Sequence, residues 1–348
     1  MAGGDAMTRP PETRGWTRLP DAELLQLRFC DLGLKFSGTA LERKLRRVDG
    51  ELERRGIVFR PHMWLSEEWF SPDGVPGIAV PFYLAHPRLM QLERRMMRQV
   101  EGGNSTWMMR ILRHEVGHAI DTAFRLRRRA RWRAVFGPAS LPYPQSYRAR
   151  PGSRSFVRHL GEWYAQSHPT EDFAETFAVW LQPESDWRRT YASWPAWEKL
   201  RLVDELMREI AGATPLVRSR AFIEPVTSNT RTLAQHYREK LARQQDWRSE
   251  AVDGMLLRVF ARRPARRGVM RAAAFLRAHR RELLTNSPLY GEIDHYTLHH
   301  MLRIAIDGSD NMQLYLRGSQ RNALPHARWL LARLIRLLDE RERPQLNL

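Results

Sequence analysis

The chain is poor in cysteine and contains no long apolar run. Its 348 residues include one cysteine, Cys30, so no disulfide bond can form within the chain. The longest apolar stretch, residues 77–85, is shorter than a membrane span and is broken by Pro81. The first residues lack a basic segment followed by an apolar core, so we expect no signal peptide. Together these features predict a soluble, cytoplasmic protein without a membrane partner.

Acidic residues are scarce relative to basic ones. The chain has 57 Lys and Arg residues against 39 Asp and Glu residues, a formal net charge of +18. Residues 216–348 hold 24 of the basic residues and 13 of the acidic ones. This excess indicates either an acidic partner, such as nucleic acid or a carboxylate-rich substrate, or helix surfaces solvated by arginine. The sequence carries no known nucleic-acid-binding motif, so nucleic acid is the less favoured partner.

The run HEVGH at residues 114–118 is the strongest chemical signal in the chain. On a helix, His114 and His118 lie one turn apart on the same face. Two imidazoles in this arrangement can occupy two corners of a tetrahedral zinc site. Glu115 would lie beside them, where it could accept a proton from a water at the metal. The alternative is a surface helix that carries these residues by chance.

The neighbours of this run favour a buried helix. The run GGNS at residues 102–105 predicts a turn and an N-cap just before the helix. Burying two histidines and a glutamate costs free energy unless a partner satisfies them, and zinc would do so. The apolar residues that recur at helical spacing around the run are Trp107, Met108, Ile111, Leu112, Ala119, Ile120 and Phe124.

A second helix is predicted to supply the third ligand. The run EDFAE at residues 171–175 places Glu171 and Glu175 on one helix face, and Pro169 suits the first turn of that helix. One glutamate can bind zinc while the other hydrogen-bonds a ligand histidine. Their spacing does not decide which is which, and two solvated carboxylates are the simpler alternative.

The two runs resemble the Glu-zincin metallopeptidases, the group that includes the catalytic domain of anthrax lethal factor. Three further stretches make the chain similar to a bacterial family called putative zinc-binding metallopeptidases. These stretches are RPHMWL at residues 60–65, PFYLAHP at residues 81–87 and AQSHP at residues 165–169. The resemblance extends over residues 20–240.

The resemblance implies a role for each residue of the site. The zinc ligands would be His114, His118 and Glu171. Tyr164, seven residues before the ligand glutamate, would stabilise the oxyanion. Residues that support the ligands from outside would be Glu175 and Asp121. The gap between the two runs is longer than in lethal factor, which leaves the intervening loop and the shape of the pocket undefined by the resemblance.

Substrate recognition is less defined. An extended substrate would pair with an edge strand near the metal, and residues 57–65 and 77–84 are the candidate strands. His168, three residues before Glu171, could contact the substrate. A residue at this position more often caps the helix that follows.

We therefore expect an α+β, mostly helical protein with a zincin-like metallopeptidase core and a small sheet, followed by a helical C-terminal region. The expected divisions are a mobile N-terminal segment at residues 1–20, a catalytic domain at residues 21–215 and a basic helical region at residues 216–348.

The predicted activity is zinc-dependent hydrolysis of peptide, isopeptide or other amide bonds, with Glu115 as the general base. A peptidase and an amidase would use the same site, so the sequence does not separate them. The competing hypothesis is a basic, nucleic-acid-associated protein that uses the zinc fold as a scaffold or sensor. Such a protein would bind nucleic acid with a steep salt dependence.

Overall fold

The chain forms two compact units, as seen in a computed structural model. The first comprises residues up to 143 together with residues 155–160 and 168–243, and the second comprises residues 144–154, 161–167 and 244 onward. The residues that the structure describes are 15–97, 100–144, 147, 150, 152–160, 163–183, 185–245, 250–285 and 295–342.

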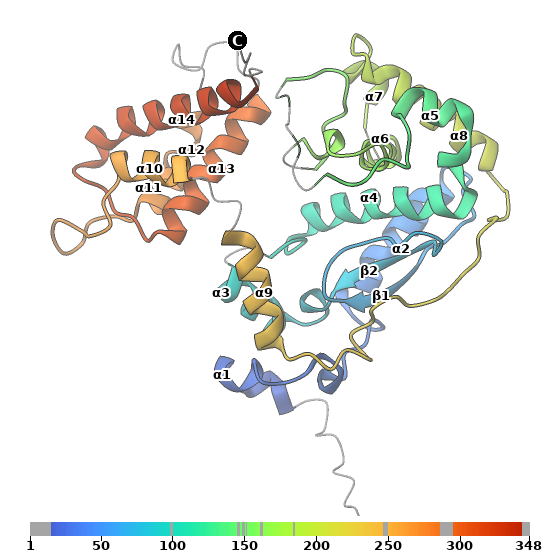
Figure 1. Ribbon diagram of the computed structural model, residues 1–348, viewed down its shortest axis with the longest axis horizontal. Coiled ribbons are helices and arrows are strands. Elements are labelled where there is room, and N and C mark those ends of the chain that lie inside the picture. The colour runs from blue at the N-terminus through green and yellow to red at the C-terminus, as the bar shows by residue number, and fades with distance from the viewer. Residues whose placement is uncertain are drawn as a thin grey trace, which may run out of the picture. The chain divides into compact units, whose positions relative to one another are not determined.

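The first unit is built around one long helix. Helix α4 (Ser105–Phe124) passes between a small sheet on one side and helix α6 (Pro169–Leu181) on the other (Figure 1). Because α4 is covered on opposite faces, it buries residues around most of its circumference instead of along one stripe. The HEVGH run therefore lies inside the unit.

Further helices enclose this centre. Helices α5 (Ala130–Phe136) and α8 (Ala196–Ile210) pack against α6, and α2 (Ala40–Glu53) packs against α4. The other elements of the first unit are η1 (Gly15–Arg18), α1 (Asp21–Leu24), η2 (Phe29–Leu32), η3 (Phe82–Ala85), α3 (Pro87–Met97), η4 (Leu126–Arg128), α7 (Trp187–Thr190) and most of α9 (Leu233–Gln245).

The sheet has two parallel strands, β1 (His62–Ser66) and β2 (Gly77–Pro81). Both candidate strands are present with shorter bounds than expected. Phe70, in the connection between them, forms an antiparallel bridge with Ala79. The residues after Phe70 thus bring the chain back along β2, and the chain reverses twice between β1 and β2. This double reversal lets a short connection join parallel strands without a crossover helix.

The first unit extends beyond both predicted boundaries. At its start, Trp16 is buried and its indole nitrogen donates to the Leu32 carbonyl (2.9 Å), so this residue packs on the first unit, while the mobility of residues 1–20 stays a prediction. Residues 1–14 lie outside the described residues. Beyond residue 215, Val226 donates its amide to the Leu65 carbonyl, and α9 buries Leu233 and Tyr237 in the core of this unit.

The second unit is helical and has its own apolar core. Helix α13 packs against α11 and α14, and α10 packs against α13 and α14. The elements of this unit are η5 (Tyr164–Gln166), α10 (Glu250–Val259), α11 (Ala272–Ala278), α12 (Arg280–Leu284), α13 (His295–Asn311) and α14 (Gln320–Glu342). A mostly helical chain with one small sheet is thus confirmed. Over the described parts of the chain, no helix is long and apolar enough to cross a membrane.

Candidate metal centre

Helix α4 presents the HEVGH run from a capped, buried segment. Asn104 Oδ1 accepts a hydrogen bond from the Trp107 amide (2.9 Å), which satisfies one of the free amides at the helix start and confirms the predicted N-cap. Both His114 and Glu115 are buried. Because polar side chains in such a place need partners, their contacts decide what the helix can do.

Helices α4 and α6 approach closely at Gly117. A Cβ atom added there would lie 3.0 Å from the Ala174 Cα atom and 3.1 Å from the Phe177 ring. The far side of α6 packs on α8, so α6 has little freedom to retreat. Glycine at this position of the motif therefore permits the contact that brings the histidines of α4 to the carboxylates of α6.

Replacing Gly117 by alanine is expected to lower the melting temperature. The alanine would gain about 1 kcal/mol of helix propensity, but overpacking against a fixed backbone costs about 1–3 kcal/mol. Gly50→Ala in α2 is the matched control, because its added methyl group would meet only the flexible end of Arg54 at 3.7 Å. Thermal unfolding followed by circular dichroism checks both variants. A Gly117→Ala protein as stable as the Gly50→Ala protein would contradict the close approach.

Helix α6 begins at His168, which serves as the N-cap. The Thr170 amide lies 3.3 Å from His168 Nδ1, and Pro169 occupies the first turn as predicted. The other ring nitrogen, Nε2, donates to the Leu141 carbonyl (2.9 Å), which leaves Nδ1 as the acceptor. His168 is buried in this role, so its contact with a substrate stays a prediction.

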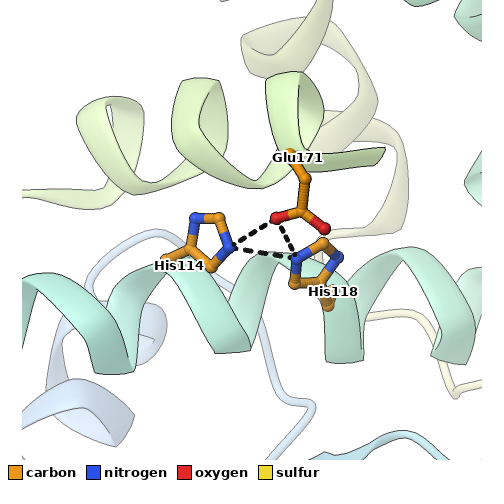
Figure 2. Close-up of side chains that lie close together, drawn as sticks. All are labelled: His114, His118 and Glu171. Carbon is orange, nitrogen blue, oxygen red and sulfur yellow. Dashed lines mark hydrogen bonds and ion pairs between the residues drawn. The ribbon is translucent and has the colours of Figure 1, made fainter. Parts of the chain in front are cut away.

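Three donor atoms from the two helices converge. Figure 2 shows His114 and His118 of α4 directed at Glu171 of α6. Glu171 Oε2 lies 3.0 Å from His114 Nε2 and 3.1 Å from His118 Nε2. The two histidine nitrogens are 3.1 Å apart. Among the described residues, His114, His118 and Glu171 form a group whose donor atoms lie close enough together to hold a metal ion.

The donor set fits zinc. Tetrahedral zinc with imidazole and carboxylate ligands requires donor atoms about 3.4 Å apart, so the three observed separations need to open by only a few tenths of an ångström. Two neutral imidazole nitrogens and a carboxylate are ligands that zinc prefers. The residues present therefore suit a bound zinc ion.

Glu175 fixes the orientation of His114. Its Oε1 lies 2.8 Å from His114 Nδ1, and its Oε2 accepts a hydrogen bond from the Leu160 amide (2.8 Å). When Nδ1 donates to Glu175, the lone pair of Nε2 points into the site. A carboxylate behind a ligand histidine both orients the ring and makes it a better ligand. Glu175 thus contacts His114 from outside the trio, while Glu171 faces both histidines.

The charges of the cluster call for a cation. Burial by itself would lower the pKa of His114, but its hydrogen bonds to Glu171 and Glu175 raise that pKa to about 10. Burial would raise the pKa of Glu171, whereas His118 and His114 beside it hold that pKa well below its usual range. The two carboxylates therefore favour a positive charge among them, and a bound zinc ion could supply it.

Glu115 is held by a residue outside α4. Ser71, in the connection between β1 and β2, places its hydroxyl 3.1 Å from Glu115 Oε2 and 3.2 Å from the Glu115 carbonyl oxygen. Its single proton can go to either acceptor. No motif in the sequence indicates this contact, because it arises from tertiary packing.

The roles that the resemblance assigns to Asp121 and Tyr164 stay predictions. The Asp121 carboxylate pairs with the amide and guanidinium of Arg127 (2.7 and 2.6 Å) and not with a site histidine. The left-handed residue Arg125 ends α4 and turns the chain back, which brings Arg127 to Asp121. Tyr164 lies in η5 of the second unit and is 37% exposed, so its role at the zinc stays a prediction.

Tyr143 is a site residue that no motif in the sequence indicates. Its hydroxyl donates to Glu171 Oε1 (2.7 Å) and lies 2.5 Å from Thr170 Oγ1. Its ring stacks on His168, with the centroids 4.0 Å apart. The burial of the hydroxyl and the charge of Glu171 both raise the pKa of Tyr143. The two prolines that flank it predict an extended chain but not this contact.

Protonation of His159 is expected to make the free energy of unfolding depend on pH. Burial lowers the pKa of His159 to about 4, and its Nε2 donates to the Arg110 carbonyl (2.9 Å). In the unfolded chain the pKa of this histidine is about 6.5. Between pH 4 and about 6.5, His159 is therefore protonated in the unfolded state but neutral in the folded state. The free energy of unfolding should therefore fall as the pH drops through this window, by up to about 1.4 kcal/mol per pH unit.

Urea unfolding of the metal-free protein at several pH values between 7 and 4 measures this slope. His159→Asn keeps a donor near the Arg110 carbonyl but removes the titrating ring, so its slope should be shallower. Equal slopes in both proteins would show that His159 is not the titrating group.

A comparison with known families bears on this geometry. The model of the family described as "Putative zinc-binding metallo-peptidase" matches residues 91–196, which include both metal-site helices. The chain is similar to zinc-binding metallopeptidases. No curated protein and no solved structure matches the chain, so its likeness to the catalytic domain of lethal factor stays a prediction.

Proposed function

We propose that this protein is a zinc-dependent metallopeptidase of the Glu-zincin type, with His114, His118 and Glu171 as its metal ligands. The convergence of these three side chains from two helices, within the segment similar to zinc-binding metallopeptidases, carries the proposal. Three protein ligands leave one position of a tetrahedral zinc free, which is the pattern of catalytic sites. A zincin-like core for the first unit is part of the same proposal.

Zinc at this site would supply a Lewis acid that polarises a carbonyl group and lowers the pKa of a water molecule to about 7. Glu115 would remove a proton from the attacking water as its oxygen bonds to the amide carbon. When the carbon–nitrogen bond breaks, Glu115 would return that proton to the leaving nitrogen. Ser71 would orient the Glu115 carboxylate, and Tyr164 is the proposed oxyanion donor through the resemblance alone.

Peptide mixtures test this proposal. The zinc-loaded protein is incubated with a diverse peptide library and with branched peptides joined through lysine side chains, and new termini are identified by mass spectrometry. We expect cleavage that stops when zinc is chelated and returns when zinc is restored. The branched set separates a peptidase from an isopeptidase. Cleavage that is insensitive to chelation would contradict a zinc mechanism, and no cleavage in either set would contradict the proposed activity.

A further inference from the structure

The carboxylate of Glu171 has two oxygens with different surroundings. Oε2 faces the two site histidines at 3.0 and 3.1 Å, whereas Oε1 accepts the hydrogen bond of the Tyr143 hydroxyl at 2.7 Å. Glu171 is buried, so both oxygens need partners. Tyr143 satisfies the oxygen that the metal site does not use.

The direction of the hydrogen bond between Tyr143 and Glu171 follows from the charge of the carboxylate. The ionised carboxylate of Glu171 has no proton, so the Tyr143 hydroxyl must be the donor between them. The proton of Tyr143 is then used, and the single proton of the Thr170 hydroxyl has two acceptors within reach, the Tyr143 oxygen at 2.5 Å and His168 Nδ1 at 2.7 Å. The Thr170 amide is directed at His168 Nδ1. Tyr143 therefore donates to Glu171, and Thr170 contacts both Tyr143 and His168.

The tyrosine ring is held in place from one side. It lies flat on His168, with an angle of 17° between the two rings. His168 is fixed in turn by its bonds to the Leu141 carbonyl and the Thr170 amide. Tyr143 itself is 60% exposed, so this stacking and the hydroxyl contacts orient a side chain that would otherwise rotate in solvent.

We propose that Tyr143 is the positioning residue of the third metal ligand, which holds Glu171 so that Oε2 alone faces the metal. This inference rests on the proposed zinc site. A glutamate held by one oxygen leaves more room at the open position than one that binds through both oxygens. The role of Tyr143 is distinct from that of the oxyanion tyrosine, which the resemblance places at Tyr164.

Zinc affinity measures this role without a substrate. Tyr143→Phe keeps the ring and its stacking on His168 and removes only the hydroxyl. Partners of metal ligands contribute about 10- to 100-fold in affinity, so we expect the zinc Kd of Tyr143→Phe to rise by that factor in competition with a chromophoric chelator. Tyr315→Phe in the second unit, which also loses one hydroxyl, is the matched control and should bind zinc like the wild type. Circular dichroism checks that both variants are folded.

The outcomes separate the two proposals. If the wild type binds zinc and Tyr143→Phe binds it equally well, the role of Tyr143 is overturned while the metal site stands. If the wild type binds no zinc, the proposed function fails first. Weaker binding by the folded Tyr143→Phe protein, but not by Tyr315→Phe, supports the positioning role.

A separate observation concerns the loop between α10 and α11 of the second unit. In Figure 1 this loop stands out from the helices of its unit. Its base is pinned, because Ala261 exchanges two backbone hydrogen bonds with Tyr315 (2.9 and 2.8 Å) and Leu316 donates to the Met270 carbonyl (3.1 Å). Both ends of the loop are therefore held in place by backbone hydrogen bonds.

The tip carries four exposed arginines: Arg262, Arg263, Arg266 and Arg267. None of the four side chains has a hydrogen-bond or ion-pair partner among the residues that the structure describes. This differs from exposed arginines such as Arg46 and Arg201, which pair with glutamates one helical turn away. Unpaired charge of one sign on a pinned loop suits a polyanion.

The composition of the loop favours nucleic acid over an acidic protein. Residues 262–268 contain no apolar residue larger than proline, so the loop lacks the aromatic or aliphatic anchors of a protein interface. They also contain no aromatic residue to stack on bases. The planar guanidinium group of arginine can donate two hydrogen bonds to the oxygens of one phosphate group. We infer that the loop binds the phosphate backbone of nucleic acid without sequence preference.

Salt dependence tests this inference on the full chain. Binding to a labelled DNA duplex is followed by fluorescence anisotropy between 50 and 200 mM salt. Each lost phosphate contact reduces the slope of log affinity against log salt by about 0.9, so replacing the four loop arginines by glutamine should reduce it by about 3–4. The control replaces four paired, exposed arginines, Arg28, Arg46, Arg189 and Arg201, and changes the net charge equally.

A loss of slope confined to the loop variant supports the inference. Equal slopes in the two variants would overturn it. Binding to polyglutamate without binding to DNA would also overturn it in favour of an acidic protein partner.

Discussion

Replacing Glu115 by glutamine is expected to slow hydrolysis by roughly 100- to 10,000-fold while zinc stays bound. Glutamine has nearly the same shape and can still accept the Ser71 hydrogen bond, but it cannot take a proton from water. The rate is measured on the best peptide from the library, and zinc is measured by elemental analysis of the same samples.

A matched substitution guards against a general effect of losing one charge. Glu205→Gln in α8, at a partly exposed position, makes the same chemical change away from the site and should retain the wild-type rate. Full activity in Glu115→Gln would remove Glu115 from the role of base. Loss of zinc from that variant would instead place Glu115 among the ligands.

Replacing Glu171 by alanine is expected to have the largest effect on metal binding. The variant loses a ligand and leaves two histidines without their facing carboxylate, so zinc should be removed by dialysis against a weak chelator. Glu175→Gln should keep zinc but bind it about 10- to 100-fold more weakly, because the partner of His114 loses its charge. Zinc Kd values for both variants give the comparison.

The order of these two effects is the informative result. Zinc retained by Glu171→Ala but lost from a Glu175→Ala variant would exchange the roles of the two glutamates. Similar affinities in wild type and Glu175→Gln would show that the contact with His114 contributes little to metal binding.

The local features of the site could be predicted because they depend on residues close together in the sequence. The cap at Asn104, the helix through residues 114–118 and the first-turn proline at Pro169 follow from spacing and capping preferences. The spacing of Glu171 and Glu175 places both on one face but leaves open which one faces the histidines. The structure gives Glu171 the facing position.

The partners of these residues could not be predicted, because they come from distant segments. Tyr143 and Ser71 lie in connections whose sequence indicates only turns and extended chain. The Leu160 amide has no side-chain signal at all, yet it fixes Glu175. Such contacts are set by how the segments pack, which periodicity does not encode.

The direction of the strands shows the same limit. The sequence predicts a strand in each of the two ranges, and the structure has a strand in both, with a turn at residues 73–74 between them. Across that turn, Phe70 pairs antiparallel with Ala79 of β2. The strand β1 pairs with β2 in parallel. A turn signal locates a reversal of the chain but does not say which residues pair across it.

The metal content of the protein tests the central claim most directly. Wild-type protein, purified without added zinc, is compared by elemental analysis with His114→Ala and Glu171→Ala variants whose folding is checked by circular dichroism. We expect about one zinc per wild-type chain and almost none in either variant. A wild-type protein that holds no zinc, even after zinc is offered, would contradict the assignment of His114, His118 and Glu171 as a metal site.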